Sequence, residues 1–300
     1  MRYNDGGVGT ARALTSPTQL RPLLERHGLW LRKRFGQHFL CDANILNKIV
    51  GAAEIVPGDP VLEIGAGIGT LTVALAEAGA RVVAVEIDGR LLPLLRENVA
   101  GFNNVEVVHT DVLRLNCARA MGPRTHSWKV AANLPYSITA PVLLHLLRQR
   151  PKPELMVLMV QKEVADRLVS PPGTKEYGSL AVLLQAAMEL ERVATVSRTC
   201  FFPVPQVESA IIRLRPRKKP LVPVRLTATF EQVLRAAFGH RRKTLLNALS
   251  SSALGLTRAD AAELLAATGI QAQTRAESLG ILEFVALARA LHGRLAEVGN

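Results

Sequence analysis

The chain has 300 residues, a hydrophobic content of 48% and a formal net charge of +12. It contains neither an apolar run long enough for a membrane span nor the pattern of a secretory signal, so we expect a cytoplasmic protein with no membrane partner. Cys41, Cys117 and Cys200 form no C-x-x-C pair, which argues against a zinc site or a disulfide framework. We therefore expect no metal.

The charge is distributed unevenly along the chain. Residues 1–34 carry +5, residues 35–212 carry −1, and residues 213–300 carry +8. Basic flanks beside a neutral centre favour a polyanionic partner over a small anionic metabolite. A solvated basic surface without a partner is the alternative reading of this pattern.

The central part of the chain alternates between helical and strand patterns. Apolar spacing of three and four predicts a helix at 44–56, and repeated strand–helix units follow. Such repeats imply an α/β protein of Rossmann-like type, with a mostly parallel sheet covered by helices on both faces. The predicted strands are 60–65, 80–88, 104–113, 128–136, 154–161, 191–205 and 208–216, and the further helices include 71–79, 90–101, 139–150 and 179–190.

The pattern changes after the last of these strands. Residues 216–226 contain three prolines and read as a linker, whereas 227–300 are helical in periodicity throughout. We therefore divide the chain into an extension (1–30), a main domain (31–215), this linker and a smaller all-helical domain (227–300).

The segment VLEIGAGIGT at 61–70 predicts a buried strand that ends in a glycine loop. Glycine allows the backbone to turn with positive φ and to approach a ligand closely. Glu86 ends the next strand, at a distance typical of a carboxylate that binds ribose hydroxyls. Thr70 departs from the G-x-G-x-x-G fingerprint, which disfavours a nicotinamide or flavin dinucleotide without excluding it, and a P-loop sequence is absent. A nucleoside-containing cofactor is expected.

Asn133, Leu134, Pro135 and Tyr136 follow another predicted strand. Ligands of parallel sheets bind at the carboxyl ends of the strands, so these residues should meet Gly65, Glu86 and Asp111 in one crevice. Asn133 offers a neutral acceptor and Tyr136 an aromatic face. The exocyclic amine of a base needs such an acceptor, because hydrogen bonds from its N–H groups favour the geometry in which its lone pair can attack. The base itself can stack on the aromatic face. A proline turn with a structural Asn and a core Tyr is the alternative.

These motifs resemble those of S-adenosylmethionine-dependent amino-methyltransferases, and more narrowly the bacterial ribosomal RNA small-subunit adenine N6-dimethyltransferase family. The resemblance rests on GAGIGT, EID, TDVL and NLPY, on KRFGQHFL at 33–40 and VQKEVADRL at 160–168, and on FFPVPQVESA at 201–210 and FGHRRKTLLN at 238–247. It implies methyl transfer from S-adenosylmethionine to N6 of two adjacent adenosines near the 3′ end of 16S ribosomal RNA, in ribosome biogenesis.

The resemblance also implies roles for single residues. Asn133 would lie between the methyl donor and the base, with Leu134 and Pro135 supplying carbonyls and Tyr136 stacking on the adenine. Phe202 and Pro203 would form the opposite wall. The implied cofactor contacts are Gln37, His38 and Leu40, Gly65 and Gly67, Glu86 and Ile87, Asp111 and Val112, and Asn133.

The basic run Arg241, Arg242 and Lys243 would contact RNA phosphates, although in isolation it reads as a solvated turn. His38 stands where many relatives have Asn, and Gln206 where Lys is common. The role of residues 1–30 is left open between a helix packed on the main domain and an additional RNA contact. We expect a monomer.

The sequence leaves three alternative functions open. One is a related enzyme that methylates large-subunit RNA and confers antibiotic resistance. Another is a non-catalytic ribosome assembly factor, which the intact Asn133, Pro135 and Tyr136 argue against. The third is a nicotinamide-dependent oxidoreductase, disfavoured by Thr70 and by the basic flanks.

Overall fold

The computed structural model describes residues 14–29, 38–122, 125, 127–240 and 242–298. Their contacts divide the chain into two compact units. The first comprises the residues up to Ala165 together with Glu191–Arg215, and the second comprises Asp166–Leu190 and the residues from Pro216 onward. Each unit is described separately below.

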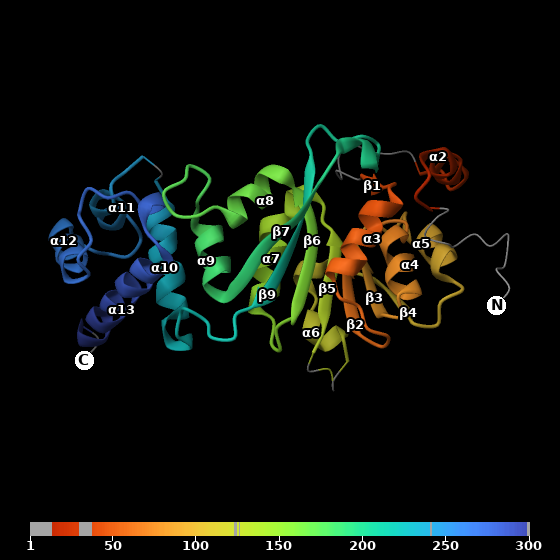
Figure 1. The fold of residues 1–300 in the computed structure, drawn as a ribbon. Helices are drawn as coiled ribbons and strands as arrows, with labels where there is room; N and C mark the ends of the chain where they lie inside the picture. The colour runs from red at the N-terminus through yellow and green to blue at the C-terminus, as the bar shows by residue number, and fades with distance from the viewer. Residues whose placement is uncertain (1–13, 30–37, 123–124, 126, 241, 299–300) are drawn as a thin grey trace. The chain divides into compact units, whose positions relative to one another are not determined.

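The first unit is built on a seven-stranded sheet in the described residues, with the order β4-β3-β2-β5-β6-β9-β7 (Figure 1). Strands β4, β3, β2, β5 and β6 are parallel, and β9 is antiparallel to β6. The predicted Rossmann-like fold with a mostly parallel sheet is therefore confirmed. Because the chain leaves β2 toward β4 and leaves β5 toward β6, right-handed crossovers place α4 and α5 on one face and α7 on the other.

The elements of this unit lie close to their predicted positions. The early part contains α2 (Pro17–Arg26), β1 (Phe39–Leu40) and α3 (Ala43–Ala52). The alternating part contains β2 (Pro60–Ile64), α4 (Thr70–Glu77), β3 (Arg81–Glu86), α5 (Leu92–Val99), β4 (Val105–His109), the 3₁₀ turn η2 (Val112–Arg114), α6 (Cys117–Ala120), β5 (Lys129–Asn133), η3 (Tyr136–Ile138), α7 (Thr139–Arg148) and β6 (Leu155–Gln161). It ends with α8 (Lys162–Val169), whose residues from Asp166 onward belong to the second unit. The last part contains β7 (Met188–Val196), η4 (Arg198–Cys200), β8 (Phe201–Phe202) and β9 (Ser209–Pro216).

The single strand predicted over 191–205 is wrong. The structure has β7, which begins earlier at Met188, then the turn η4, and then the short strand β8. β8 leaves the main sheet and pairs antiparallel with β1, so that Phe39 is opposite Phe202 and Leu40 is opposite Phe201. The apolar pattern identified extended backbone here, but it could not show which partner each part would take.

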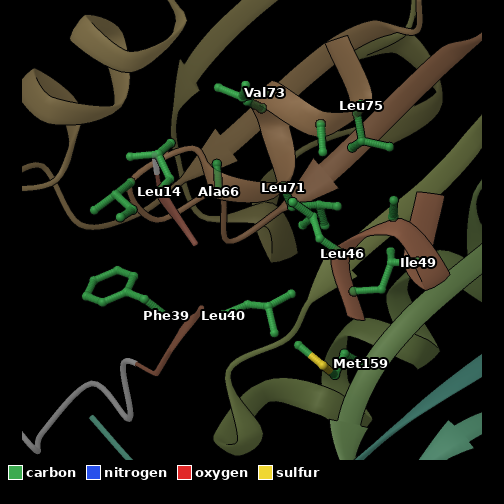
Figure 2. Close-up of a cluster of buried hydrophobic side chains, with 14 of the residues drawn as sticks. Leu14, Phe39, Leu40, Leu46, Ile49, Ala66, Leu71, Val73, Leu75 and Met159 are labelled. Atoms are coloured by element: carbon green, nitrogen blue, oxygen red, sulfur yellow. The ribbon is translucent and has the colours of Figure 1, made fainter. Parts of the chain in front are cut away.

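The core of the first unit lies directly beneath the glycine loop. Leu46 and Ile49 of α3, Leu71 and Leu75 of α4 and Met159 of β6 are all buried in one cluster (Figure 2). Leu14 from the N-terminal part of the chain belongs to the same cluster. The loop at the end of β2 is therefore supported by packing on several sides.

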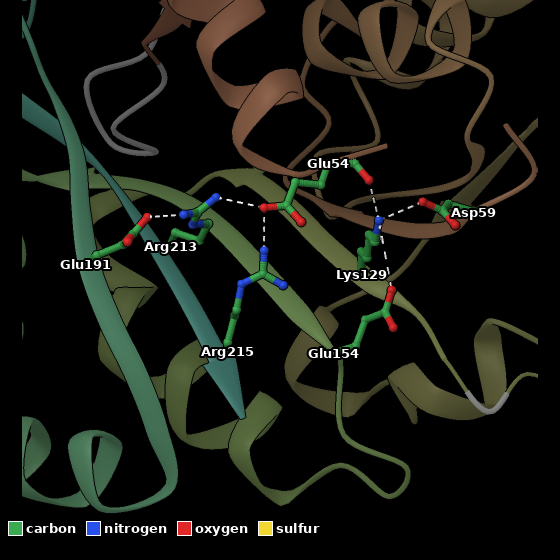
Figure 3. A network of polar contacts seen from close by, with 7 residues as sticks. All are labelled: Glu54, Asp59, Lys129, Glu154, Glu191, Arg213 and Arg215. Carbon is green, nitrogen blue, oxygen red and sulfur yellow. Dashed lines mark hydrogen bonds and ion pairs between the residues drawn. The ribbon is translucent and has the colours of Figure 1, made fainter. Parts of the chain in front are cut away.

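A polar network lies at the amino ends of the central strands, which is the edge opposite to the strand carboxyl ends. Lys129 at the start of β5 is 7% exposed, and its Nζ donates to the carbonyl oxygen of Glu54 at 2.5 Å and to Asp59 Oδ2 at 2.7 Å. These contacts compensate the cost of burying the ammonium group. The network continues through the side chain of Glu54 and consists of Glu54, Asp59, Lys129, Glu154, Glu191, Arg213 and Arg215 (Figure 3).

The second unit is helical, as predicted for the C-terminal part. It contains α9 (Ser179–Ala187), η5 (Val224–Leu226), α10 (Thr227–Phe238), α11 (Leu245–Ser250), α12 (Arg258–Ala267), η6 (Ala276–Ser278) and α13 (Ile281–Val298). The predicted boundary at 215 places α9 in the larger domain, whereas Ala181, Val182 and Ala186 of α9 share a buried cluster with Phe230 and Phe284. None of the described helices combines the length and the apolar character that crossing a membrane requires.

Candidate active site

The glycine loop between β2 and α4 contains three residues with positive φ, namely Gly65 (72°), Gly67 (62°) and Gly69 (93°). At Gly69 a Cβ atom would also lie 2.9 Å from Leu95 Cδ1, which is closer than such contacts allow. The backbone conformation therefore favours glycine at this position, and any Cβ atom would also require the tip of the Leu95 side chain to shift. The loop lies at the carboxyl end of β2 and borders a cavity.

Glu86 at the end of β3 is held in place by backbone N–H groups. Its Oε2 accepts from Gly67 N at 2.7 Å, and its Oε1 accepts from Ile87 N at 2.9 Å and from Asp88 N at 2.8 Å. Burial raises the pKa of the Glu86 carboxyl, and these three N–H groups oppose the shift. A carboxylate offers about four lone-pair sites, so capacity remains for a hydroxyl donor in the cavity.

Asp111 follows β4 and caps the turn η2. Its Oδ1 accepts from Leu113 N at 2.9 Å, which fixes the carboxylate at the rim of the cavity. Val112 beside it is buried, and Ile87 is exposed at 59% although it lines the same cavity. An exposed apolar side chain next to a capped carboxylate suits a flat, polar-edged ring.

Asn133 ends β5, and its side-chain amide is oriented by the residue that precedes β1. The Nδ2 of Asn133 donates to the carbonyl oxygen of His38 at 3.1 Å. Because a carbonyl oxygen only accepts, this contact decides which end of the amide faces His38. The Oδ1 of Asn133 is the group left to accept a hydrogen bond, as the predicted role requires.

Leu134, Pro135 and Tyr136 continue from β5 along the cavity wall. Leu134 is buried and donates its N–H to Met159 O at 3.0 Å, and the carbonyl of Pro135 accepts from Ile138 N at 3.1 Å. A carbonyl oxygen has two lone pairs, so the Pro135 carbonyl can accept a second hydrogen bond. Pro135 also lies against Gly65, where a Cβ atom would be 3.4 Å from Pro135 Cδ.

The ring of Tyr136 is fixed at both ends. Its hydroxyl is 2.7 Å from Ser209 Oγ, and its ring stacks on that of His38 with 5.9 Å between centroids. Burial raises the pKa of Tyr136, so the phenol stays neutral at physiological pH. His38 donates through Nδ1 to the carbonyl oxygen of Pro203 at 2.8 Å, since that oxygen can only accept.

These side chains line one cavity of about 410 Å³ at the carboxyl ends of the strands. Phe202 and Pro203 do not line it, although Pro203 is connected to it through His38. Arg242 and Lys243 belong to the second unit, and Gln37 and Arg241 lie outside the described residues. The predicted residues that the cavity brings together are His38, Leu40, Gly65, Gly67, Glu86, Ile87, Asp111, Val112, Asn133, Leu134, Pro135 and Tyr136.

Glu63 is a cavity residue to which the sequence patterns assign no role. It is 2% exposed in the middle of β2, and its Oε2 has no hydrogen-bond partner among the described residues. Burial raises the pKa of its carboxyl to about 8, with the Thr72 hydroxyl opposing the shift and Glu86 adding to it. A carboxylate inside an otherwise apolar strand is the signal that could have identified it.

Comparisons with known proteins identify the family of the chain. The model of the family described as ribosomal RNA adenine dimethylase matches residues 28–292. A ribosomal RNA small subunit methyltransferase A from Pelotomaculum thermopropionicum is 46% identical over 283 residues, covering 92% of this chain and 96% of that protein. A protein of the same name from Geobacillus kaustophilus is 44% identical and covers 93% and 97%.

Two solved structures show the same fold. A dimethyladenosine transferase from Plasmodium falciparum has a TM-score of 0.69 and 27% identity, covering 85% of this chain and 98% of that one. The 23S rRNA methyltransferase ErmE has a TM-score of 0.63 and 30% identity, covering 84% and 99%. The fold and the cavity define a methyltransferase of the Rossmann-like class. Within that class, the chain belongs to the ribosomal RNA adenine dimethylase family.

Proposed function

We propose that this protein transfers methyl groups from S-adenosylmethionine to N6 of two adjacent adenosines near the 3′ end of 16S ribosomal RNA, giving N6,N6-dimethyladenosine during small-subunit biogenesis. The two small-subunit methyltransferases, which are 46% and 44% identical over nearly their whole length, support this substrate. Such a substrate implies that the enzyme acts in the cytoplasm.

The single observation that carries the proposal is the oriented amide of Asn133. Its Nδ2 is engaged by His38 O, and the ring of Tyr136 stands beside it against His38. A neutral acceptor next to an aromatic face suits an adenine turned out of its stack, because the amine needs an acceptor and the ring needs a stacking partner. Leu134 and Pro135 supply the adjoining backbone.

The residues on the other side of the cavity fit the cofactor. Glu63 presents an unpartnered carboxylate oxygen for an ammonium group, and Gly65 and Gly67 leave space where side chains would stand. Glu86 would accept from the ribose hydroxyls, and Asp111 would accept from the adenine amine beside Ile87. When bound, S-adenosylmethionine supplies an activated methyl group on its sulfonium.

Asn133 then contributes positioning and a preorganised acceptor rather than a strong base. Its Oδ1 accepts from the N6 amine and favours the geometry in which the nitrogen lone pair can form the new bond. After methyl transfer N6 would carry a positive charge, and its extra proton would then be lost to water. Tyr136 holds the ring plane, and its neutral hydroxyl stays on Ser209.

The second unit supports binding of the RNA backbone. Arg242 and Lys243 are exposed ahead of α11, and Arg258 at the start of α12 donates to Asn247 Oδ1 at 2.6 Å. Lys and Arg side chains on such a surface bind phosphates and make the affinity depend on salt. They do not by themselves read sequence, which would come from the shape of the folded RNA.

The test is incubation with a tritiated methyl donor and three substrates: hypomethylated small subunits, fully methylated small subunits, and large subunits. We expect label only in the hypomethylated small subunits, mapped to two neighbouring adenosines. Label in the large subunit would instead support the function of ErmE, which is 30% identical. No label in any substrate, together with intact RNA binding, would support the non-catalytic assembly factor.

A further inference from the structure

The N-terminal helix α2 is docked onto the first unit. Leu20 and Leu24 on one face of α2 are 0% and 2% exposed, and both belong to the cluster beneath the glycine loop. The helix ends at Arg26, the φ of 62° at Gly28 allows the chain to turn after it, and His27 contacts Glu97 of α5 at 3.1 Å. α2 is therefore a fixed part of this unit.

The exposed face of α2 carries Arg21, which lies against Phe202 of β8. The Cζ of Arg21 lies 5.7 Å from the centroid of the Phe202 ring. Phe202 precedes Pro203, whose carbonyl accepts from His38, and His38 stacks on Tyr136. A continuous set of contacts thus joins Arg21 to the aromatic residue proposed to hold the target base.

The guanidinium of Arg21 is held by a ring rather than by an acid. Among the residues that the structure describes, no carboxylate forms an ion pair with it, although Glu25 lies one turn further along the same helix. A guanidinium stacked on an aromatic ring keeps its N–H edge available, and this edge matches the oxygens of a phosphate. Arg21 is exposed.

We propose that Arg21 binds a backbone phosphate of the RNA strand that carries the target adenosine. The inference rests on the proposed function, and it assigns to α2 a role in binding the substrate. A flipped base enters the cavity while its charged phosphates stay outside, because an unpaired phosphate is costly to bury. Arg21 stands outside the cavity on the Phe202 side, where that backbone would pass.

RNA is favoured over an acidic protein segment by what surrounds Arg21. The Phe202 ring beneath Arg21 is connected through His38 to Tyr136, which lines the cavity proposed to accept the base. Cations interleaved with aromatic faces are typical of single-strand binding. Arg198, another exposed cation, lies just before Phe202 in the chain. Its Nη1 donates to Gln206 O at 3.3 Å and supports the loop after Pro203.

The test compares Arg21→Gln with the matched control Arg26→Gln, which removes the same charge from an exposed position on the same helix. For each we would measure KM and kcat on hypomethylated small subunits, and the slope of log affinity against log salt. We expect Arg21→Gln to raise KM by roughly threefold to tenfold at unchanged kcat. Its salt slope should fall by about 0.7 to 0.9, the change for one lost phosphate contact.

Arg26→Gln should match the wild type, and Arg21→Lys should retain the salt slope because it keeps the charge. Donor affinity and Tm are measured for each variant, because a merely structural role of Arg21 would lower these and leave the slope unchanged. That result, or an equal fall in slope for Arg26→Gln, would overturn the inference. Absence of methyl transfer by the wild type would overturn the proposed function instead, so the two failures are distinguishable.

Discussion

The side-chain amide of Asn133 donates to the backbone carbonyl of His38, 95 residues earlier in the chain. This contact joins the carboxyl end of β5 to the segment that enters β1. It leaves the Oδ1 of Asn133 as the acceptor that the target amine requires. A backbone group from outside the main sheet therefore sets the orientation of the proposed catalytic residue.

Asn133→Ala should abolish methyl transfer while binding of the donor persists. Removing one preorganised hydrogen-bonding group from an active site typically lowers kcat by about 10²–10³-fold. Isothermal titration with S-adenosylmethionine and transfer of tritiated methyl to hypomethylated small subunits would measure the two effects separately. Asn44→Ala, which removes an exposed amide from α3, is the matched control. Equal activity of Asn133→Ala and the control would refute the assigned role.

Tyr136→Phe should keep most of the activity and lose stability. The ring that we propose stacks on the base remains, but Ser209, which is fully buried, loses the partner of its hydroxyl. A buried polar group left without a partner costs about 1–3 kcal/mol in the free energy of unfolding. Denaturant unfolding would measure this loss.

The double variant Tyr136→Phe with Ser209→Ala should recover part of that stability, because both partners are then apolar. Tyr136→Ala is the contrasting case, since it removes the ring and should strongly reduce methyl transfer. If Tyr136→Phe were as inactive as Tyr136→Ala, the phenol rather than the ring would be the essential group.

Glu63 should make the free energy of unfolding fall as the pH rises between about 4.5 and 8. Its pKa is raised to about 8 by burial, from an ordinary value of 4.5, so the folded state retains a proton that the unfolded state releases in this window. Glu63→Gln removes the titration and should therefore stabilise the protein more at pH 8 than at pH 5. Urea unfolding of both proteins at the two pH values would measure the difference, with Glu106→Gln at an exposed position of β4 as the control.

Binding of the donor should release a proton from Glu63 near pH 7. The ammonium group of the donor would favour the ionised carboxylate and lower its pKa. Titration calorimetry in buffers with different ionisation enthalpies reports the number of protons released. Glu63→Gln should show no such release, and an unchanged release in this variant would assign the proton to another group.

Gly69→Ala should destabilise the loop that supports the cavity. The φ of 93° is unfavourable for any residue with a side chain, and the new Cβ would meet Leu95 Cδ1 at 2.9 Å. We expect a loss of roughly 1–3 kcal/mol in the free energy of unfolding. Gly101→Ala is the control, because its Cβ would meet no atom within 4 Å and its φ is not positive. A similar loss for both would argue against this explanation.

The sequence patterns predicted the sheet and the residues at its carboxyl ends, because parallel strands bring their ends to one edge whatever their separation along the chain. Gly65, Glu86, Asp111 and Asn133 were found by this rule, and the cavity contains all of them. This rule does not predict which side chains contact one another. Tyr136 and Ser209, for example, are 73 residues apart, and no periodicity relates them.

Two further features depended on tertiary packing. Glu63 occupies a strand position whose neighbours are buried, and only the folded structure shows that this buried carboxyl lies beside the cavity. The segment that contains α9 has the same helical periodicity as the helices of the first unit, and only its contacts with Phe230 and Phe284 assign it to the second. Periodicity gives the face of a helix that is buried, but it does not give the partner.

The pairing of β1 with β8 has a consequence for synthesis of the protein. The residues between Glu63 and Asp111 that we propose to bind the cofactor emerge early from the ribosome. The His38–Pro203 and Tyr136–Ser209 contacts cannot form until the chain has been translated beyond Ser209. Because domains generally begin to fold from the N-terminus during translation, a nascent chain can complete the proposed donor-binding part of the cavity well before it can complete the part proposed to hold the target adenine.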